Sequence, residues 1–117
     1  MGVTPFVDEV FRACERACMK REPHTVIAVV LGPHDAERVA RWCGEDAGRL
    51  GCVYYLPCSE HAFDVGTCRV KVMALSDAIA HEKTFPRGCT VIVDAVARMH
   101  ATVQGQEPAL AALLCPH

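Results

Sequence analysis

The sequence lacks any apolar run approaching the ~20 residues that a membrane-spanning helix needs. Its first ten residues, MGVTPFVDEV, carry acids where a signal peptide carries bases followed by a long apolar core. Charge of neither sign is in excess, since 12 Lys and Arg oppose 14 Asp and Glu, so charge does not predict binding to a phosphate backbone. These absences predict a soluble, intracellular protein with no membrane contact.

The chain also lacks the composition of a disordered protein, because 51% of its residues are hydrophobic and 22% are charged. Its 117 residues suit one domain with a single modest core. We find no internal repeat and no low-complexity segment in it. We therefore expect one globular domain.

Cysteine is abundant, with eight residues in the chain but no CxxC pair. We interpret most of them as reduced, buried thiols, which behave as small hydrophobes. The alternative is a zinc site built from Cys52, Cys58, His61 and Cys68, or from Cys14 and Cys18 on one helical face. The spacing C-x5-C-x2-H-x6-C matches no standard zinc finger or ribbon, so we expect no metal site.

Apolar periodicity predicts the order of the elements. Residues at spacings of three and four predict helices over 4–21 and 34–49, and another in EPALAALLC near Pro108. Continuous apolar runs predict strands in TVIAVVLG and CTVIVDA, with further strands in CVYYLP and CRVKVMALS. CSEHAFDVG is predicted to be a polar turn region and SDAIAHEK a short helical turn.

This order predicts an α/β fold, with a mostly parallel sheet, helices on both faces, and TVIAVV and CTVIVD as central strands. Ligands of such sheets bind outside the carboxyl ends of the strands. Asp94 directly follows the apolar run VIV and is therefore predicted to face a ligand crevice. Alternatively, Asp94 caps the segment AVARMH as the start of a helix or turn.

The order of these segments resembles nucleotide-driven DNA motors, and in particular the large terminase subunit of tailed and herpes-type viruses. VIVDA is similar to the Walker B strand of that family, whose Asp holds the Mg²⁺ of a bound nucleotide. The preceding CRVKVMALSDAIAHEKTFPRG resembles the family's strand, polar loop and Arg-Gly pair, here Arg87 and Gly88. TVIAVVLGPHDAERVARWCGEDAGRLG is similar to an upstream strand, small loop and helix.

The resemblance implies a partial RecA-like, P-loop NTPase core over 1–117 that acts in viral DNA packaging, in the host nucleus for a herpes-type virus. It places Asp94, Arg87 and Gly88 at a nucleotide and Mg²⁺ site. The expected partners are the remainder of the terminase large subunit or other packaging proteins, with DNA contacted only indirectly.

The chain departs from that family at two positions that carry chemistry. It has no G-x-x-x-x-G-K-[ST] loop, whose N–H groups and Lys hold the phosphates. Ala95 stands where the Walker B Glu polarises water. We therefore expect a fragment or degenerate relative with no catalytic residues, which binds Mg²⁺ and ATP only in a complete assembly and no cofactor alone.

Two alternatives come from other functional classes. The first is a small intracellular α/β binding module without ATPase ancestry, which the balanced charge, the missing P-loop and Ala95 support. The second is a hydrolytic or metal enzyme built on His61, His81, His100 and the thiols. These histidines do not have the H-E-x-x-H spacing, so the sequence favours the binding module over the enzyme.

Overall fold

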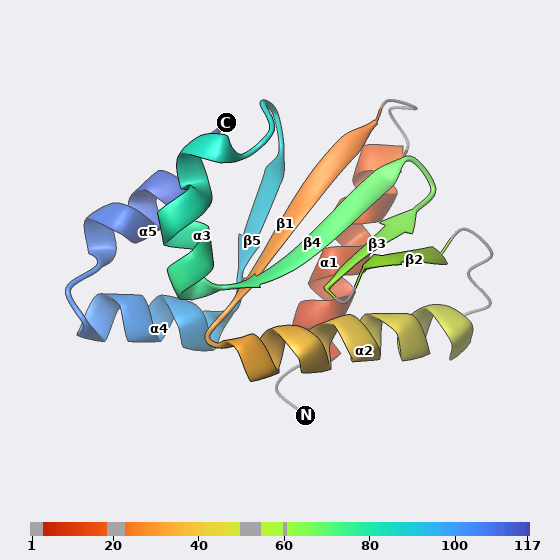
Figure 1. Ribbon diagram of the computed structural model, residues 1–117, viewed down its shortest axis with the longest axis horizontal. Helices are drawn as coiled ribbons and strands as arrows, with labels where there is room; N and C mark the ends of the chain where they lie inside the picture. The colour runs from red at the N-terminus through yellow and green to blue at the C-terminus, as the bar shows by residue number, and fades with distance from the viewer. Residues whose placement is uncertain (1–3, 19–22, 50–54, 60) are drawn as a thin grey trace.

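A computed structural model describes residues 4–18, 23–49, 55–59 and 61–117. Its α-helices are α1 (Thr4–Cys18), α2 (Pro33–Arg49), α3 (Leu75–His81), α4 (Ala95–Val103) and α5 (Glu107–Leu114), and η1 (Glu82–Thr84) is a 3₁₀ turn. Its strands are β1 (His24–Val30), β2 (Tyr55–Ser59), β3 (Ala62–Val65), β4 (Cys68–Ala74) and β5 (Thr90–Val93). Together they form a mixed α/β fold in which helices flank one sheet (Figure 1).

The sheet has the strand order β2-β3-β4-β1-β5. The strand β1 pairs in parallel with β4 and with β5, whereas β2 with β3 and β3 with β4 are antiparallel. The prediction of a mostly parallel sheet is therefore wrong for half of the strand pairs. The reason is a tight hairpin in the predicted turn region: Gly66, at φ 61°, and Thr67 join β3 to β4, and so short a connection allows only antiparallel strands.

The two strongest strands lie side by side in one sheet, as predicted, but only β1 is central. The strand β5 occupies an edge and pairs with β1 alone among the described strands. Its two buried residues, Ile92 and Val93, pack into different clusters on opposite faces of the sheet. A continuously apolar strand thus indicates that both faces are covered, which does not require neighbours on both edges.

Alternate residues of β1 supply two separate cores. Val26, Ala28 and Val30 pack with α1 and α2 in the first cluster. Ile27 and Val29 point to the other face and pack with α3, α4 and α5 in the second. This alternation follows from the two-residue period of a strand, and it confirms that helices cover both faces (Figure 1).

The predicted helices are confirmed with small changes of boundary. The first is described as far as Cys18, and the rest of its predicted range lies outside the described residues. The second begins at Pro33, whose fixed φ suits the first position of a helix. The helix α4 was predicted only as the alternative in which Asp94 starts a helix or turn. No helix in the described part of the chain is long and apolar enough to cross a membrane.

Removal of a side chain from β1 tests its central place in the core. Ile27 is 1% exposed, so Ile27→Ala should lower the free energy of unfolding by about 2–5 kcal/mol, measured by denaturant titration. Met99→Ala is the control, because Met99 is 68% exposed and its loss should change stability by no more than about 0.5 kcal/mol. Equal effects of the two variants would contradict the described packing of β1.

Candidate functional site

The parallel strands β1 and β5 end side by side, and the chain enters a helix after each. Val29 of β1 is paired with Val93 of β5 at this end. A cleft of about 220 Å³ opens here, with apolar walls from α1, β1, α2 and α4. Its polar side chains are Asp35, Arg38 and Asp94. In open α/β sheets, ligands bind outside the carboxyl ends of parallel strands, and this is that end of β1 and β5.

The backbone of Asp94 links β5 to α4. Its N–H donates to the carbonyl of Val29 at 2.9 Å, which extends the ladder between β5 and β1 by one bond. Its carbonyl accepts the N–H of Arg98 at 3.0 Å, which begins α4. The residue therefore has the N-cap position of a helix, as the capping alternative predicted, but its carboxylate makes no capping hydrogen bond.

The Asp94 side chain is half-buried, and it lines the cleft with Phe6 at the start of α1. Burial raises the pKa of the Asp94 carboxyl above 3.8, and the nearby N–H of Ala95 opposes part of this rise. The negative charge of Asp35 raises the pKa further. Two carboxylates thus line the same cleft, and the charge of Asp35 disfavours that of Asp94.

Asp35 closes the start of α2. Its Oδ2 accepts the N–H of Gly32 at 3.2 Å, while the carbonyl of Gly32 accepts the N–H of Ala36 at 3.0 Å. This is the carboxylate half of a capping box, in which a side chain in the first turn reaches back to the residue before the helix. The N–H groups of Gly32 and Asp94 both have partners within the protein, so neither is open to a phosphate oxygen.

Arg38 supplies the positive charge of the cleft. Its guanidinium carbon lies 5.0 Å from the centre of the Trp42 ring, one helical turn further along α2, which is a cation–π distance. The cleft therefore combines two carboxylates and one guanidinium with apolar walls. Such a site suits a cation or a small polar group on an apolar ligand better than a triphosphate.

Arg87 and Gly88 lie at the other end of β5. Arg87 lines a different groove, of about 370 Å³, near the amino ends of the parallel strands. Gly88 has φ 78°, and its N–H donates to the carbonyl of His117. The expected grouping of Arg87 and Gly88 with Asp94 is thus not found, because the whole strand β5 separates them.

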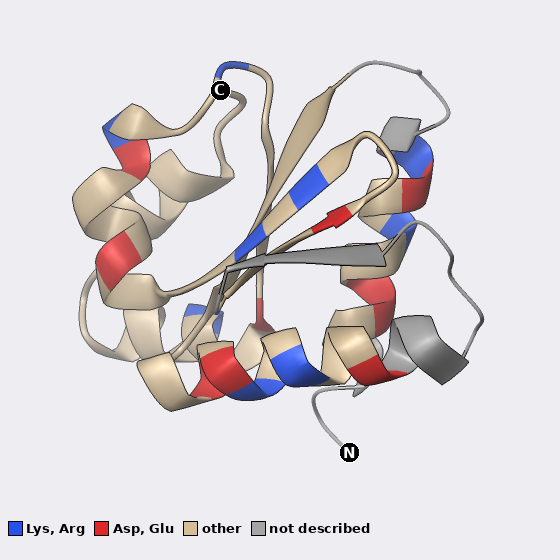
Figure 2. Ribbon diagram, turned by 45° about the vertical axis from the view of Figure 1, so that its right-hand side comes forward, with Lys and Arg blue, Asp and Glu red and all other residues tan. Residues whose placement is uncertain are grey.

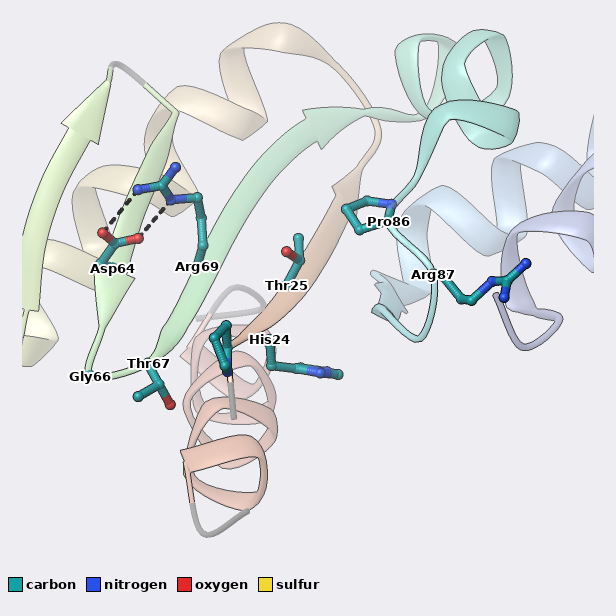
Figure 3. Close-up of a pocket in the computed structure, with 9 residues that line it drawn as sticks. His24, Thr25, Asp64, Gly66, Thr67, Arg69, Pro86 and Arg87 are labelled. Atoms are coloured by element: carbon teal, nitrogen blue, oxygen red, sulfur yellow. Dashed lines mark hydrogen bonds and ion pairs between the residues drawn. The ribbon is translucent and has the colours of Figure 1, made fainter. Parts of the chain in front are cut away.

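Two of the charged side chains in the groove at Arg87 form an ion pair with each other. Figure 3 shows Arg69 paired with Asp64, at 2.8 and 3.1 Å, while the guanidinium of Arg87 points away from this pair. The His24 ring is hydrogen-bonded to the hydroxyl of Thr90 at 2.7 Å. We therefore do not assign this groove as the functional site.

The thiols and histidines form no metal centre among the described residues, which contain no group of three His, Cys, Asp or Glu able to hold a metal ion. Cys52 lies outside the described residues, and the structure does not describe the side chains of Cys18 and Cys58, so both zinc hypotheses remain untested. Cys14 and Cys68, which belong to different zinc hypotheses, are neighbours with their sulfurs 3.5 Å apart.

Acidic and basic residues are mixed on the two helices that cover one face of the sheet. Both signs occur along α1 and along α2 (Figure 2). On α2, Glu37 and Arg41 form an exposed ion pair at 3.7 Å, one turn apart.

The cleft at Asp94 is the candidate site. No family model, no curated protein and no solved structure matches this chain. The sequence predicted Asp94 as a site residue but not Asp35 or Arg38. The signal for Asp35 was present, because an acid three residues after a Gly-Pro helix start is typical of a first-turn capping group.

The raised pKa of Asp94 makes a prediction about stability and pH. Because its pKa is higher in the folded than in the unfolded chain, wild-type stability is reduced as pH rises through the folded pKa. Asp94→Asn, which stays neutral, should therefore melt at a higher temperature than wild type at pH 7 and at the same temperature well below pH 3.8.

The matched control for this comparison is Glu15→Gln, which removes one exposed negative charge from α1 outside the cleft. Thermal melting of the three proteins across the pH range measures the effect of the Asp94 charge on stability. Asn caps a helix about as well as Asp, so the substitution leaves capping almost unchanged. An Asp94→Asn variant that is less stable than wild type at pH 7 would therefore contradict the raised pKa of Asp94.

Proposed function

We propose that this chain is a fragment or degenerate relative of the ATPase domain of a viral terminase large subunit. In this proposal β5 and Asp94 are the Walker B-like element of a RecA-like core. The observation that supports it most is the Asp94 carboxylate, which makes no cap and enters a cleft at the end of two parallel strands. The start of α1 lines the same cleft.

The residues of the cleft suit a metal ion better than a nucleotide. Carboxylate oxygens are the protein ligands that Mg²⁺ prefers, and Asp94 and Asp35 both line the cleft. A triphosphate needs open N–H groups, but those of Gly32 and Asp94 already donate within the protein. At about 220 Å³ the cleft is also smaller than the ~300–1,000 Å³ usual for drug-sized ligands.

The role proposed for this chain is therefore to position a metal ion and not to catalyse hydrolysis. Ala95 follows Asp94 and carries no group that polarises water. The phosphate cradle and the general base come, in this proposal, from other parts of the packaging machinery. Those parts are the remainder of the large subunit or other packaging proteins.

The second candidate is an α/β binding module without ATPase ancestry. The apolar walls of the cleft favour it, because small-molecule sites are mostly apolar with a few polar groups that fix orientation. Its ligand would carry a positive charge toward Asp94 and Asp35. Mg²⁺ dependence distinguishes the two candidates, since only the ATPase relative needs a divalent cation.

The isolated chain should not bind Mg·ATP at micromolar concentrations, because it offers no phosphate cradle. Titration calorimetry with Mg·ATP measures this directly. Micromolar binding would refute the claim that the isolated chain cannot hold the phosphates of ATP. Hydrolysis of ATP by the wild-type chain that disappears in Asp94→Asn would refute it more strongly.

Activity in an assembly tests the proposed function itself. A reading frame near the gene that encodes G-x-x-x-x-G-K-[ST] identifies the protein to co-purify with this chain. The complex should hydrolyse ATP in the presence of Mg²⁺, and Asp94→Asn should lower the rate by at least about a hundredfold, since a metal ligand contributes several kcal/mol.

The control in that assembly is Asp64→Asn, because Asp64 lines the groove near the amino ends of β1 and β5 and not the cleft. It should leave the hydrolysis rate within about twofold of wild type. Full activity of the complex with Asp94→Asn would exclude the terminase proposal and leave the binding module.

A further inference from the structure

Two buried thiols from distant parts of the chain meet beneath α1. Cys14 lies on the inner face of α1 and Cys68 is the first residue of β4. Their sulfur atoms are 3.5 Å apart, with the Cys68 thiol donating to Cys14. Each residue is 1% exposed, and both belong to the cluster between the sheet and the helices α1 and α2.

The geometry suits a covalent bond between these sulfurs. A disulfide has an S–S distance of about 2.0 Å, so the sulfurs must approach by roughly 1.5 Å for the bond to form. The Cys68 pKa is lowered, first by the hydrogen bond with Cys14, while burial and the charge of Asp64 oppose this. A lowered pKa favours the thiolate, which is the nucleophile in thiol oxidation.

We propose that Cys14 and Cys68 form a redox modification site, at which oxidation joins α1 to β4 by an intramolecular disulfide. The oxidant is hydrogen peroxide, a small molecule that suits two buried thiols better than a bulky oxidant does. Cys68 thiolate attacks peroxide, giving a sulfenic acid and hydroxide, and the Cys14 sulfur then displaces the sulfenic hydroxyl as water. In sum, two thiols and one peroxide give one disulfide and two waters.

The bond has a structural consequence for the cleft. Phe6, at the other end of α1, is part of the cleft wall. A disulfide at Cys14 fixes α1 on the sheet and so limits the movement of that wall. It also closes a long loop of chain, which should raise the melting temperature by roughly 5–15 °C.

The other described thiols, those of Cys43, Cys89 and Cys115, differ from this pair in their surroundings, and burial raises the pKa of Cys89. Cys43 is buried on α2, and burial raises its pKa to about 12, so it has little thiolate at neutral pH. Cys115 is exposed at the end of α5 and is open to oxidation between molecules. The pair is therefore distinguished by a neighbouring thiol at contact distance and not by exposure.

Peptide mapping of the whole folded chain tests the proposal. The protein is treated with peroxide until no further thiol is lost, blocked with an alkylating reagent, and cut with trypsin and a protease that cleaves before Asp. These cuts release Cys14 in peptide 13–16 and Cys68 in peptide 64–69, each with no other cysteine.

The expected product is the cross-linked pair of these peptides, about 2 Da lighter than their sum and separated by a reductant. Peroxide added to the denatured chain is the comparison, and there this pairing should not dominate. Cys43→Ala should keep the cross-link and the rise in melting temperature, whereas Cys68→Ala should lose both.

Two results would overturn the proposal. One is the recovery of peptides 13–16 and 64–69 only as separate alkylated species from the folded, oxidised wild type. The other is a cross-link of Cys14 to a different cysteine, such as Cys18 in peptide 17–20. Both results come from the wild-type chain, so they hold even if a cysteine variant fails to fold.

Discussion

The burial of β1 on both faces is the constraint on which the rest of the structure depends. Val26, Ala28 and Val30 are enclosed on one side, and Ile27 and Val29 on the other, each at 1% exposure or less. A strand with no polar face is stable only between two covering layers. The helices α1 and α2 supply one layer, and α3, α4 and α5 the other (Figure 1).

The cleft follows from the same constraint. Because β5 runs parallel to β1 and pairs with it up to Val93, the two strands end side by side. The chain then continues from β1 into α2 and from β5 into α4. The side chains at these turns, Asp35 and Asp94, thus meet at one end of the sheet. The Asp35 carboxylate accepts a hydrogen bond at the start of its own helix, α2. The Asp94 carboxylate makes no capping hydrogen bond, so helix capping does not explain why an aspartate stands at this position.

Local pattern predicted the elements better than their arrangement. The apolar runs at 25–32 and 89–95 predicted β1 and β5, and the helical spacing predicted α1, α2 and α5. The pattern did not reveal the β3–β4 hairpin, because Ala62–Val65 is short and mixed in character and depends on the turn at Gly66. The pattern also did not show that β5 lies at an edge of the sheet. When helices cover both faces of a sheet, an edge strand is as apolar as a central one, so composition does not distinguish them.

The candidate site was also only partly predictable, because local pattern does not show which segments come together. A carboxylate at the end of a parallel strand is a local feature, so Asp94 was predicted, but the groups that face it come from other segments.

The central claim is that the Asp94 carboxylate belongs to the cleft and does not cap α4. Its most direct test is a carbon-13 NMR titration of the Asp94 carboxyl in the folded chain. We predict a midpoint above 3.8, because burial and Asp35 both disfavour the charged form. A midpoint at or below that value would show a carboxylate stabilised by the helix start, and would contradict the assignment of Asp94 to the cleft.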